Sequence, residues 1–204
     1  MNNSSRRKAP RYYSALILCL LCISTASCGI GTRHDDTQQR FSDLFSYELQ
    51  NRALAMYAMP EAERRSRGTP YHDFWSAYLS LEQQNQRVYA PVAAKYALSP
   101  DISNYTRLKA SLASSVSALF PNRAVDLIKD AAISYVPQLE ELRSIAPAQD
   151  RPFFDYVVDQ ERAQAEALTL LSSGSVSEAT QRLQSFLALP LSDFNVNGES
   201  HHEE

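Results

Sequence analysis

Apolar residues recur at intervals of three and four along most of this chain, and this spacing limits its fold more than any other feature. Only two of the five glycines lie between Arg40 and Leu191, and apolar and polar residues do not alternate over any sustained stretch. Spacing of three and four gathers apolar side chains on one face of an α-helix, whereas a half-buried strand needs alternation. We therefore predict an all-α helical bundle.

Proline, glycine and capping residues divide this pattern into six predicted helices. They cover residues 38–59, 71–98, 100–120, 123–145, 151–172 and 177–189. The charged segment 60–70 contains two prolines and a glycine and is predicted to be a loop, because proline lacks the amide hydrogen that a helix interior needs. Bends are expected near Pro91 and Pro137. Together these helices form one predicted domain over residues 38–191.

The first 27 residues are typical of a bacterial secretion signal. Basic residues between Arg6 and Arg11 precede an apolar run over residues 15–23, and small residues follow. This order describes a cleaved signal peptide. The run is too short for a permanent membrane helix, which needs roughly 20 residues to cross the bilayer core.

The signal ends in Thr25-Ala26-Ser27-Cys28, which resembles the lipobox of bacterial lipoproteins. That resemblance implies cleavage before Cys28 and lipidation of the cysteine, for example with palmitate. Thr25 departs from the family pattern, where leucine is usual. Each acyl methylene adds about 0.8 kcal/mol of membrane affinity, so more than one chain anchors a protein durably. The alternative is an ordinary signal peptide that contains a cysteine.

The residue after the cysteine bears on the destination within the bacterial cell envelope. Gly29 stands where an inner-membrane retention signal has aspartate, so the resemblance implies the outer membrane, with the domain facing the periplasm. Residues 28–37 are expected to form the acylated cysteine and a polar tether. Residues 192–204 are expected to form a disordered tail, because they are polar and contain few apolar side chains.

Cysteine usage and charge exclude several classes of function. All three cysteines lie at or before Cys28, so the mature chain has no disulfide, thiolate metal site or cysteine nucleophile. Cleavage would leave 177 residues and change the net charge from −3 to about −7. A negative chain without a basic stripe argues against a nucleic-acid partner. The expected partners are the membrane, through the lipid anchor, and an unidentified protein.

Polar residues interrupt the apolar stripes of three predicted helices near their middles. Glu48 lies in the first stripe, Glu82 and Asn85 in the second, and Glu161 and Gln164 in the fifth. The stripe of the fourth helix contains Tyr135 but no carboxylate. Buried carboxylates are costly unless they are paired, so these residues are predicted to meet in one polar layer.

This arrangement resembles the ferritin-like four-helix bundle over roughly residues 38–172. That superfamily uses glutamates and Glu-x-x-His pairs to hold two iron or manganese ions. Here Glu82 is followed by Asn85 and Glu161 by Gln164, so an amide stands where each histidine belongs. Imidazole is the better ligand for these metals, and the resemblance therefore implies at most a weak iron or manganese site.

The sequence leaves three interpretations of the polar layer open. The leading one is a metal-free hydrogen-bonded layer in which Arg52, Asn85, Gln164 and Tyr135 satisfy the glutamates. The others are ordinary surface residues and a degenerate metal site.

Three functions correspond to these patterns. No hydrolase, phosphate-loop or metalloprotease motif occurs, which favours a non-enzymatic binding or scaffold module. The first alternative is a ferritin-like metal-binding protein or oxidoreductase. The second is a tetratricopeptide-like interaction module, because residues 153–189 resemble one such helical hairpin, although about three repeats are needed for a solenoid.

Overall fold

The computed structural model describes residues 33–99 and 121–190, and within these ranges the chain is an all-α helical bundle without strands. The predicted helix over 100–120, the signal, Cys28 and the predicted tail lie outside the described residues. The described residues belong to one compact unit. None of the described helices is both long and apolar enough to span a membrane.

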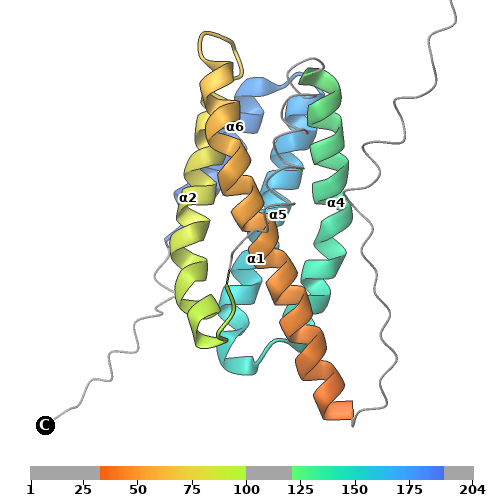
Figure 1. The fold of residues 1–204 in the computed structure, drawn as a ribbon. Helices are drawn as coiled ribbons and strands as arrows, with labels where there is room; N and C mark the ends of the chain where they lie inside the picture. The colour runs from red at the N-terminus through yellow and green to blue at the C-terminus, as the bar shows by residue number, and fades with distance from the viewer. Residues whose placement is uncertain (1–32, 100–120, 191–204) are drawn as a thin grey trace, which may run out of the picture. The chain divides into compact units, whose positions relative to one another are not determined.

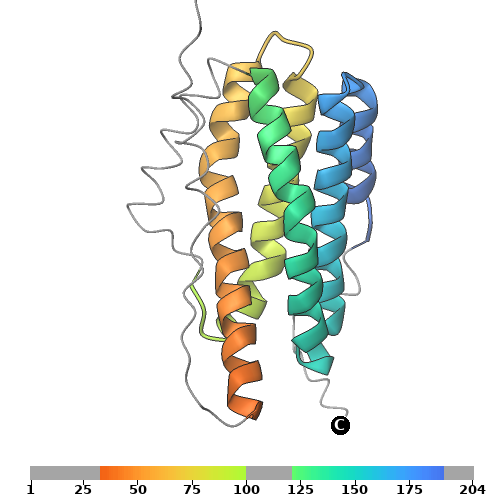
Figure 2. The same cartoon turned by 90° about the vertical axis from the view of Figure 1, so that its right-hand side faces the viewer.

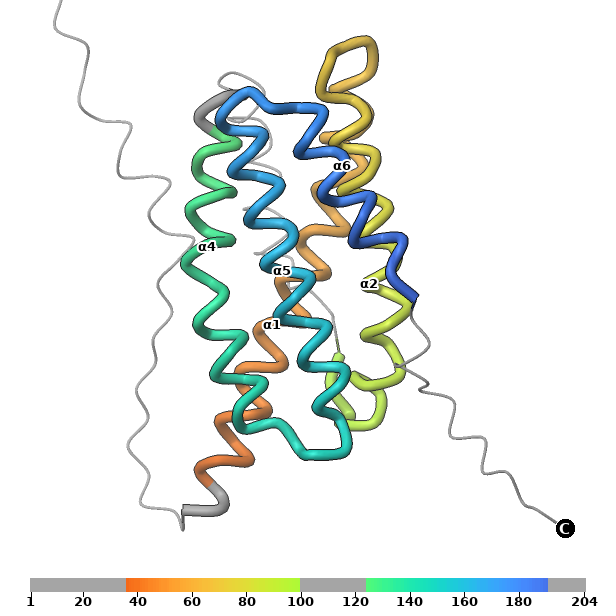
Figure 3. The backbone as a smooth tube through the Cα atoms, turned by 180° about the vertical axis from the view of Figure 1, so that it is seen from behind, coloured from red at the N-terminus to blue at the C-terminus, as the bar shows by residue number. Residues whose placement is uncertain are grey.

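Four long helices run side by side along the bundle (Figures 1 and 2). They are α1 (Arg33–Ser66), α2 (His72–Lys95), α4 (Pro121–Ile145) and α5 (Arg151–Ser172). A short 3-10 turn, η3 (Ala148–Asp150), leads into α5. The last helix, α6 (Val176–Leu187), packs against both α5 and α2, as the view from behind shows (Figure 3). Helix α5 is therefore covered from several directions.

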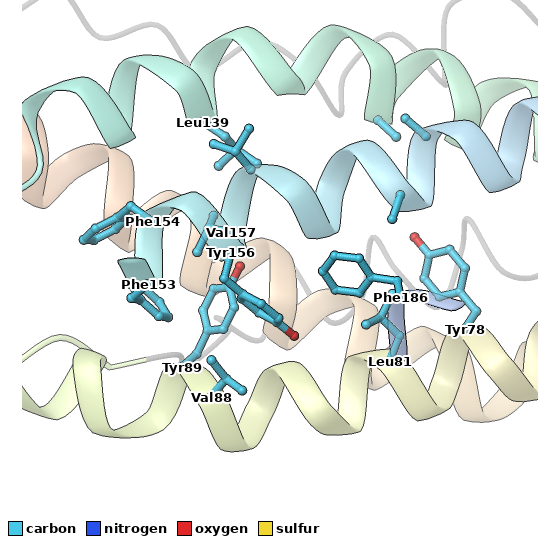
Figure 4. Close-up of a cluster of buried hydrophobic side chains, with 14 of the residues drawn as sticks. Tyr78, Leu81, Val88, Tyr89, Leu139, Phe153, Phe154, Tyr156, Val157 and Phe186 are labelled. Atoms are coloured by element: carbon cyan, nitrogen blue, oxygen red, sulfur yellow. The ribbon is translucent and has the colours of Figure 1, made fainter. Parts of the chain in front are cut away.

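The apolar core lies between α5 and its neighbours. Figure 4 shows side chains from α2, α4, α5 and α6 meeting in this space. At one end, Phe154 makes edge-on contacts with Phe41, Phe45 and Phe153, with ring centroids 4.8–5.5 Å apart. Aromatic pairs in such arrangements contribute about 0.5–1.5 kcal/mol each beyond the apolar area that they bury.

The prediction of a loop over residues 60–70 is wrong for its first part, because α1 continues through Pro60 to Ser66. The residues after the proline supply ion pairs one turn apart. Glu61 pairs with Arg64 and Arg65, and Glu63 pairs with Arg67. Such pairs each add a few tenths of a kcal/mol to a helix. Proline therefore did not end this helix, and the loop is shorter than predicted.

Several other helix ends differ from the prediction. Helix α1 begins at Arg33, so part of the expected tether is helical. Helix α2 ends at Lys95, and Ala97 follows with φ of 52°. That left-handed conformation stops the helix.

Pro60 provides a test of the continuous α1. We expect Pro60→Ala to raise the free energy of unfolding by about 1–3 kcal/mol, because alanine restores the amide hydrogen bond to the preceding turn and removes a ring clash. Urea denaturation of the full-length protein measures this change. The same substitution would have little effect if residue 60 lay in a loop, and that result would contradict a continuous α1.

Helices α5 and α6 form a tight hairpin. The turn contains Gly174 with φ of 88°, and the amide of Ser175 donates to the carbonyl of Leu170. Glycine suits this left-handed position because it has no Cβ. Helix α5 also packs extensively against α4, so within the described residues this hairpin is one part of the bundle.

Candidate functional site

The middle of the bundle contains a buried ion cluster centred on Arg52. The Nε atom of Arg52 lies 3.1 Å from Glu48 Oε1. Its Nη1 atom lies 3.0 Å from Glu82 Oε1, and its Nη2 atom lies 3.0 Å from Glu161 Oε2. One guanidinium therefore pairs with carboxylates from three different helices. We call Arg52, Glu48, Glu82 and Glu161 the Arg52 cluster.

Helical spacing places each member of the cluster. Glu48 and Arg52 are four residues apart on α1, so their side chains lie one turn apart on the same face. Glu82 lies in the buried stripe of α2, and Glu161 lies in that of α5. The Arg52 side chain is 11% exposed, and Glu48 and Glu82 have no exposed side-chain surface. The cluster is thus almost entirely removed from water.

Two tyrosines donate hydrogen bonds to the carboxylate of Glu48. The hydroxyl of Tyr89 donates to Glu48 Oε1 at 2.8 Å, and the hydroxyl of Tyr135 donates to Glu48 Oε2 at 2.9 Å. Burial raises the pKa of both phenols, as does the neighbouring Glu48 charge. Both hydroxyls therefore remain protonated donors, and α4 contributes to the site through Tyr135.

Side-chain amides complete the network around the other two glutamates. Gln164 Nε2 donates to Glu82 Oε1 at 2.6 Å, and Gln160 Nε2 donates to Gln164 Oε1 at 2.9 Å. Asn85 Nδ2 donates to Gln160 Oε1 at 2.9 Å, while Asn85 Oδ1 accepts from the hydroxyl of Tyr156 at 2.7 Å. Buried polar groups that are satisfied in this way do not incur the cost of unpaired ones.

The cluster has more acidic groups than basic ones. Burial raises the pKa of Glu161 to about 7, against the lowering effect of Arg52, and the charges of Glu48 and Glu82 add to the rise. Burial also raises the pKa of Glu48, although Arg52 and the two tyrosines oppose this. A low-dielectric site with three carboxylates and one guanidinium therefore favours the retention of protons.

The six residues singled out from the sequence all lie in or beside the Arg52 cluster: Glu48, Glu82, Asn85, Tyr135, Glu161 and Gln164. The sequence did not single out Gln160, Tyr89 or Tyr156. Tyr89 lies on the buried face of α2, and its aromatic ring is part of the apolar core. Gln160 directly precedes Glu161 and does not follow the spacing of three and four that marks the apolar stripe of α5. Its burial could have been predicted only if the buried face of α5 had been expected to be wider than one stripe.

The side chains of this site do not fit the two-metal centre that the ferritin-like resemblance implies. The point where the three carboxylates converge is filled by a guanidinium. Within the described ranges, no group of three or more His, Cys, Asp or Glu residues is arranged to hold a metal ion. The geometry supports a structural charge cluster.

Comparisons of this chain with models of protein families, with curated proteins and with solved structures returned no match.

Proposed function

We propose that this protein is a lipid-anchored lipoprotein of the bacterial cell envelope whose helical bundle acts as a non-enzymatic binding or scaffold module. The observation that carries the proposal is the sequence Thr25-Ala26-Ser27-Cys28 directly after a short apolar run. Such a run followed by small residues is typical of an export signal. The cysteine supplies the thiol that an acyl chain needs.

The interior of the bundle supports the non-enzymatic part of the proposal. The oxygens of Glu48 and Glu82 already accept hydrogen bonds or ion pairs from protein groups. A general acid or base must reach a substrate proton within hydrogen-bond distance, and these carboxylates are almost fully buried. In this proposal the carboxylates stabilise the bundle and do not act on a substrate.

The surface of the bundle offers apolar side chains to a protein partner. Tyr57 on α1 is 49% exposed, and Ile133 on α4 is 50% exposed. Tyrosine is one of the residue types enriched among those that contribute most of the binding energy in protein interfaces. The partner itself is proposed only as a protein, because the mature chain is acidic and lacks a basic stripe.

Substitution of Cys28 tests the anchor. In bacteria supplied with labelled palmitate, we expect the wild-type chain to be labelled and to partition with membranes. Cys28→Ala should abolish labelling, because the thiol that carries the acyl chain is gone. The variant should also remain unprocessed or be released as a soluble domain, which immunoblots of the membrane and soluble fractions would measure.

Cys22→Ala is the matched control, since it removes a cysteine from the apolar run and leaves Cys28 in place. This control should be labelled and processed as the wild type is. If Cys28→Ala is instead processed and retained on membranes like the wild type, the lipoprotein proposal is wrong.

A further inference from the structure

The position of Arg52 has a consequence for metal binding. Three carboxylates from α1, α2 and α5 converge on one point between the helices, and a cation from the chain itself occupies that point. We propose that Arg52 serves as a built-in cation of the polar layer and thereby excludes divalent metal ions from it. Its guanidinium takes the place that a metal ion would have among these carboxylates.

The shape of the guanidinium suits this role. Its Nη1 and Nη2 atoms donate to Glu82 and Glu161 at 3.0 Å, and Nε lies 3.1 Å from Glu48 in an ion pair that is not aligned as a hydrogen bond. Arginine stays charged at all physiological pH values and loses little freedom per hydrogen bond formed. A lysine ammonium is a compact point charge without this planar fork. Nη1 also donates to the side-chain oxygens of Gln160 and Gln164 at 3.1 and 3.2 Å, so Arg52 links three helices through both carboxylate and amide oxygens.

The remaining donors also oppose a metal ion. Glu48 accepts hydroxyl hydrogens from Tyr89 and Tyr135 on both of its oxygens. Glu82 accepts amide hydrogens from Gln164 and Asn85. These groups direct hydrogen atoms at the lone pairs that a metal would use, so a metal ion would have to displace several buried hydrogen bonds besides the guanidinium.

The connection of Arg52 to the chain distinguishes this cation from a bound ion. Arg52 lies on the same helix as Glu48, one turn away, so its charge is present as soon as α1 forms. A bound metal stabilises a fold only to the extent set by its free concentration. The polar layer is consequently independent of metal supply. With the guanidinium in place its carboxylates are not arranged to hold a metal ion, and we expect its removal to let Glu48, Glu82 and Glu161 close around one.

Manganese titration of wild type and Arg52→Ala tests the proposal. Both full-length proteins are freed of metal with a chelator and then titrated with Mn²⁺, while equilibrium dialysis measures bound ions and a thermal scan measures the melting temperature. The wild type should bind no manganese in the cluster, and its melting temperature should not change. Arg52→Ala should melt roughly 10 °C lower, bind about one Mn²⁺ per chain and recover part of that loss.

Two further variants make the result specific to the cluster. Arg162→Ala removes an arginine that pairs with Glu140 and Asp159 on the surface, and it should gain no manganese. Arg52→Gln keeps some volume and hydrogen-bond donors, and it replaces Arg52→Ala if the alanine variant does not fold. The proposal is overturned if the wild type binds manganese through Glu82 and Glu161, or if neither Arg52 variant binds more than Arg162→Ala.

Discussion

Replacing Arg52 by methionine is expected to lower the free energy of unfolding by about 3–5 kcal/mol, because it leaves buried carboxylates without their cation. Methionine fills much of the same volume, so the loss reports the missing charge more than a cavity. Glu48, Glu82 and Glu161 would then repel one another in a site of low dielectric constant. Urea denaturation of the full-length protein at neutral pH measures the change.

Two comparisons show whether charge is the cause. Arg162→Met removes an arginine whose ion pairs are exposed, and it should cost less than about 1 kcal/mol. Adding Glu82→Gln and Glu161→Gln to Arg52→Met should restore most of the lost stability, since neutral amides do not need a cation. An Arg52→Met variant as stable as the wild type would contradict the structural role of the cluster.

The second large effect concerns pH. The pKa of Glu161 is about 7 in the folded protein and ordinarily 4.5, so between these values the folded state binds more protons than the unfolded state. Linkage then requires that stability falls as pH rises from about 4.5 to 7 and levels off above. Ionisation of Glu161 lowers the free energy of unfolding by roughly 3 kcal/mol across this window.

Glu161→Gln isolates this contribution, because the amide cannot titrate. The unfolding free energy of the wild type minus that of the variant should therefore fall steadily as the pH rises from about 4.5 to 7. The groups that face Glu161 are Arg52 and Glu48 from α1 and Glu82 from α2, and they remain in the variant. Parallel stability profiles for the two proteins between pH 4.5 and 7 would contradict the raised pKa.

Exposed carboxylates act in a different pH range. Arg64 and Arg65 lower the pKa of Glu61 from 4.5 to about 2. The contribution of Glu61 to stability is therefore fully present above pH 4.5 and is lost only as the pH falls below that value. Glu61→Gln is therefore a matched control for Glu161→Gln. It should leave the slope of stability between pH 4.5 and 7 unchanged.

The sequence by itself was enough to predict the fold class. The spacing of apolar residues at three and four predicted the helices now seen as α1, α2, α4, α5 and α6, because this periodicity is a local property of the chain. The ends of the helices were predicted less well. At Pro60 the local rule for proline was outweighed by the ion pairs and packing of a long helix.

The same spacing indicated which polar residues share the buried faces. Glu48, Glu82 and Glu161 each interrupt an apolar stripe, and a carboxylate in that position must have a partner. The sequence could propose Arg52 as one partner of Glu48, since the two residues are one turn apart. It could not show that the same guanidinium reaches Glu82 and Glu161, which lie 30 and 109 residues along the chain.

Only the tertiary structure decided what the cluster is. Helix α1 packs against α2, and α5 lies across the bundle from them, so that long side chains bring three carboxylates to one arginine. Such long-range proximity leaves no periodic trace in the sequence. Gln160 became a buried member because its side chain meets Arg52 from α1 and Asn85 from α2 inside the bundle. Helix formation is set by neighbours in sequence, whereas the identity of the central cation is set by which helices pack together.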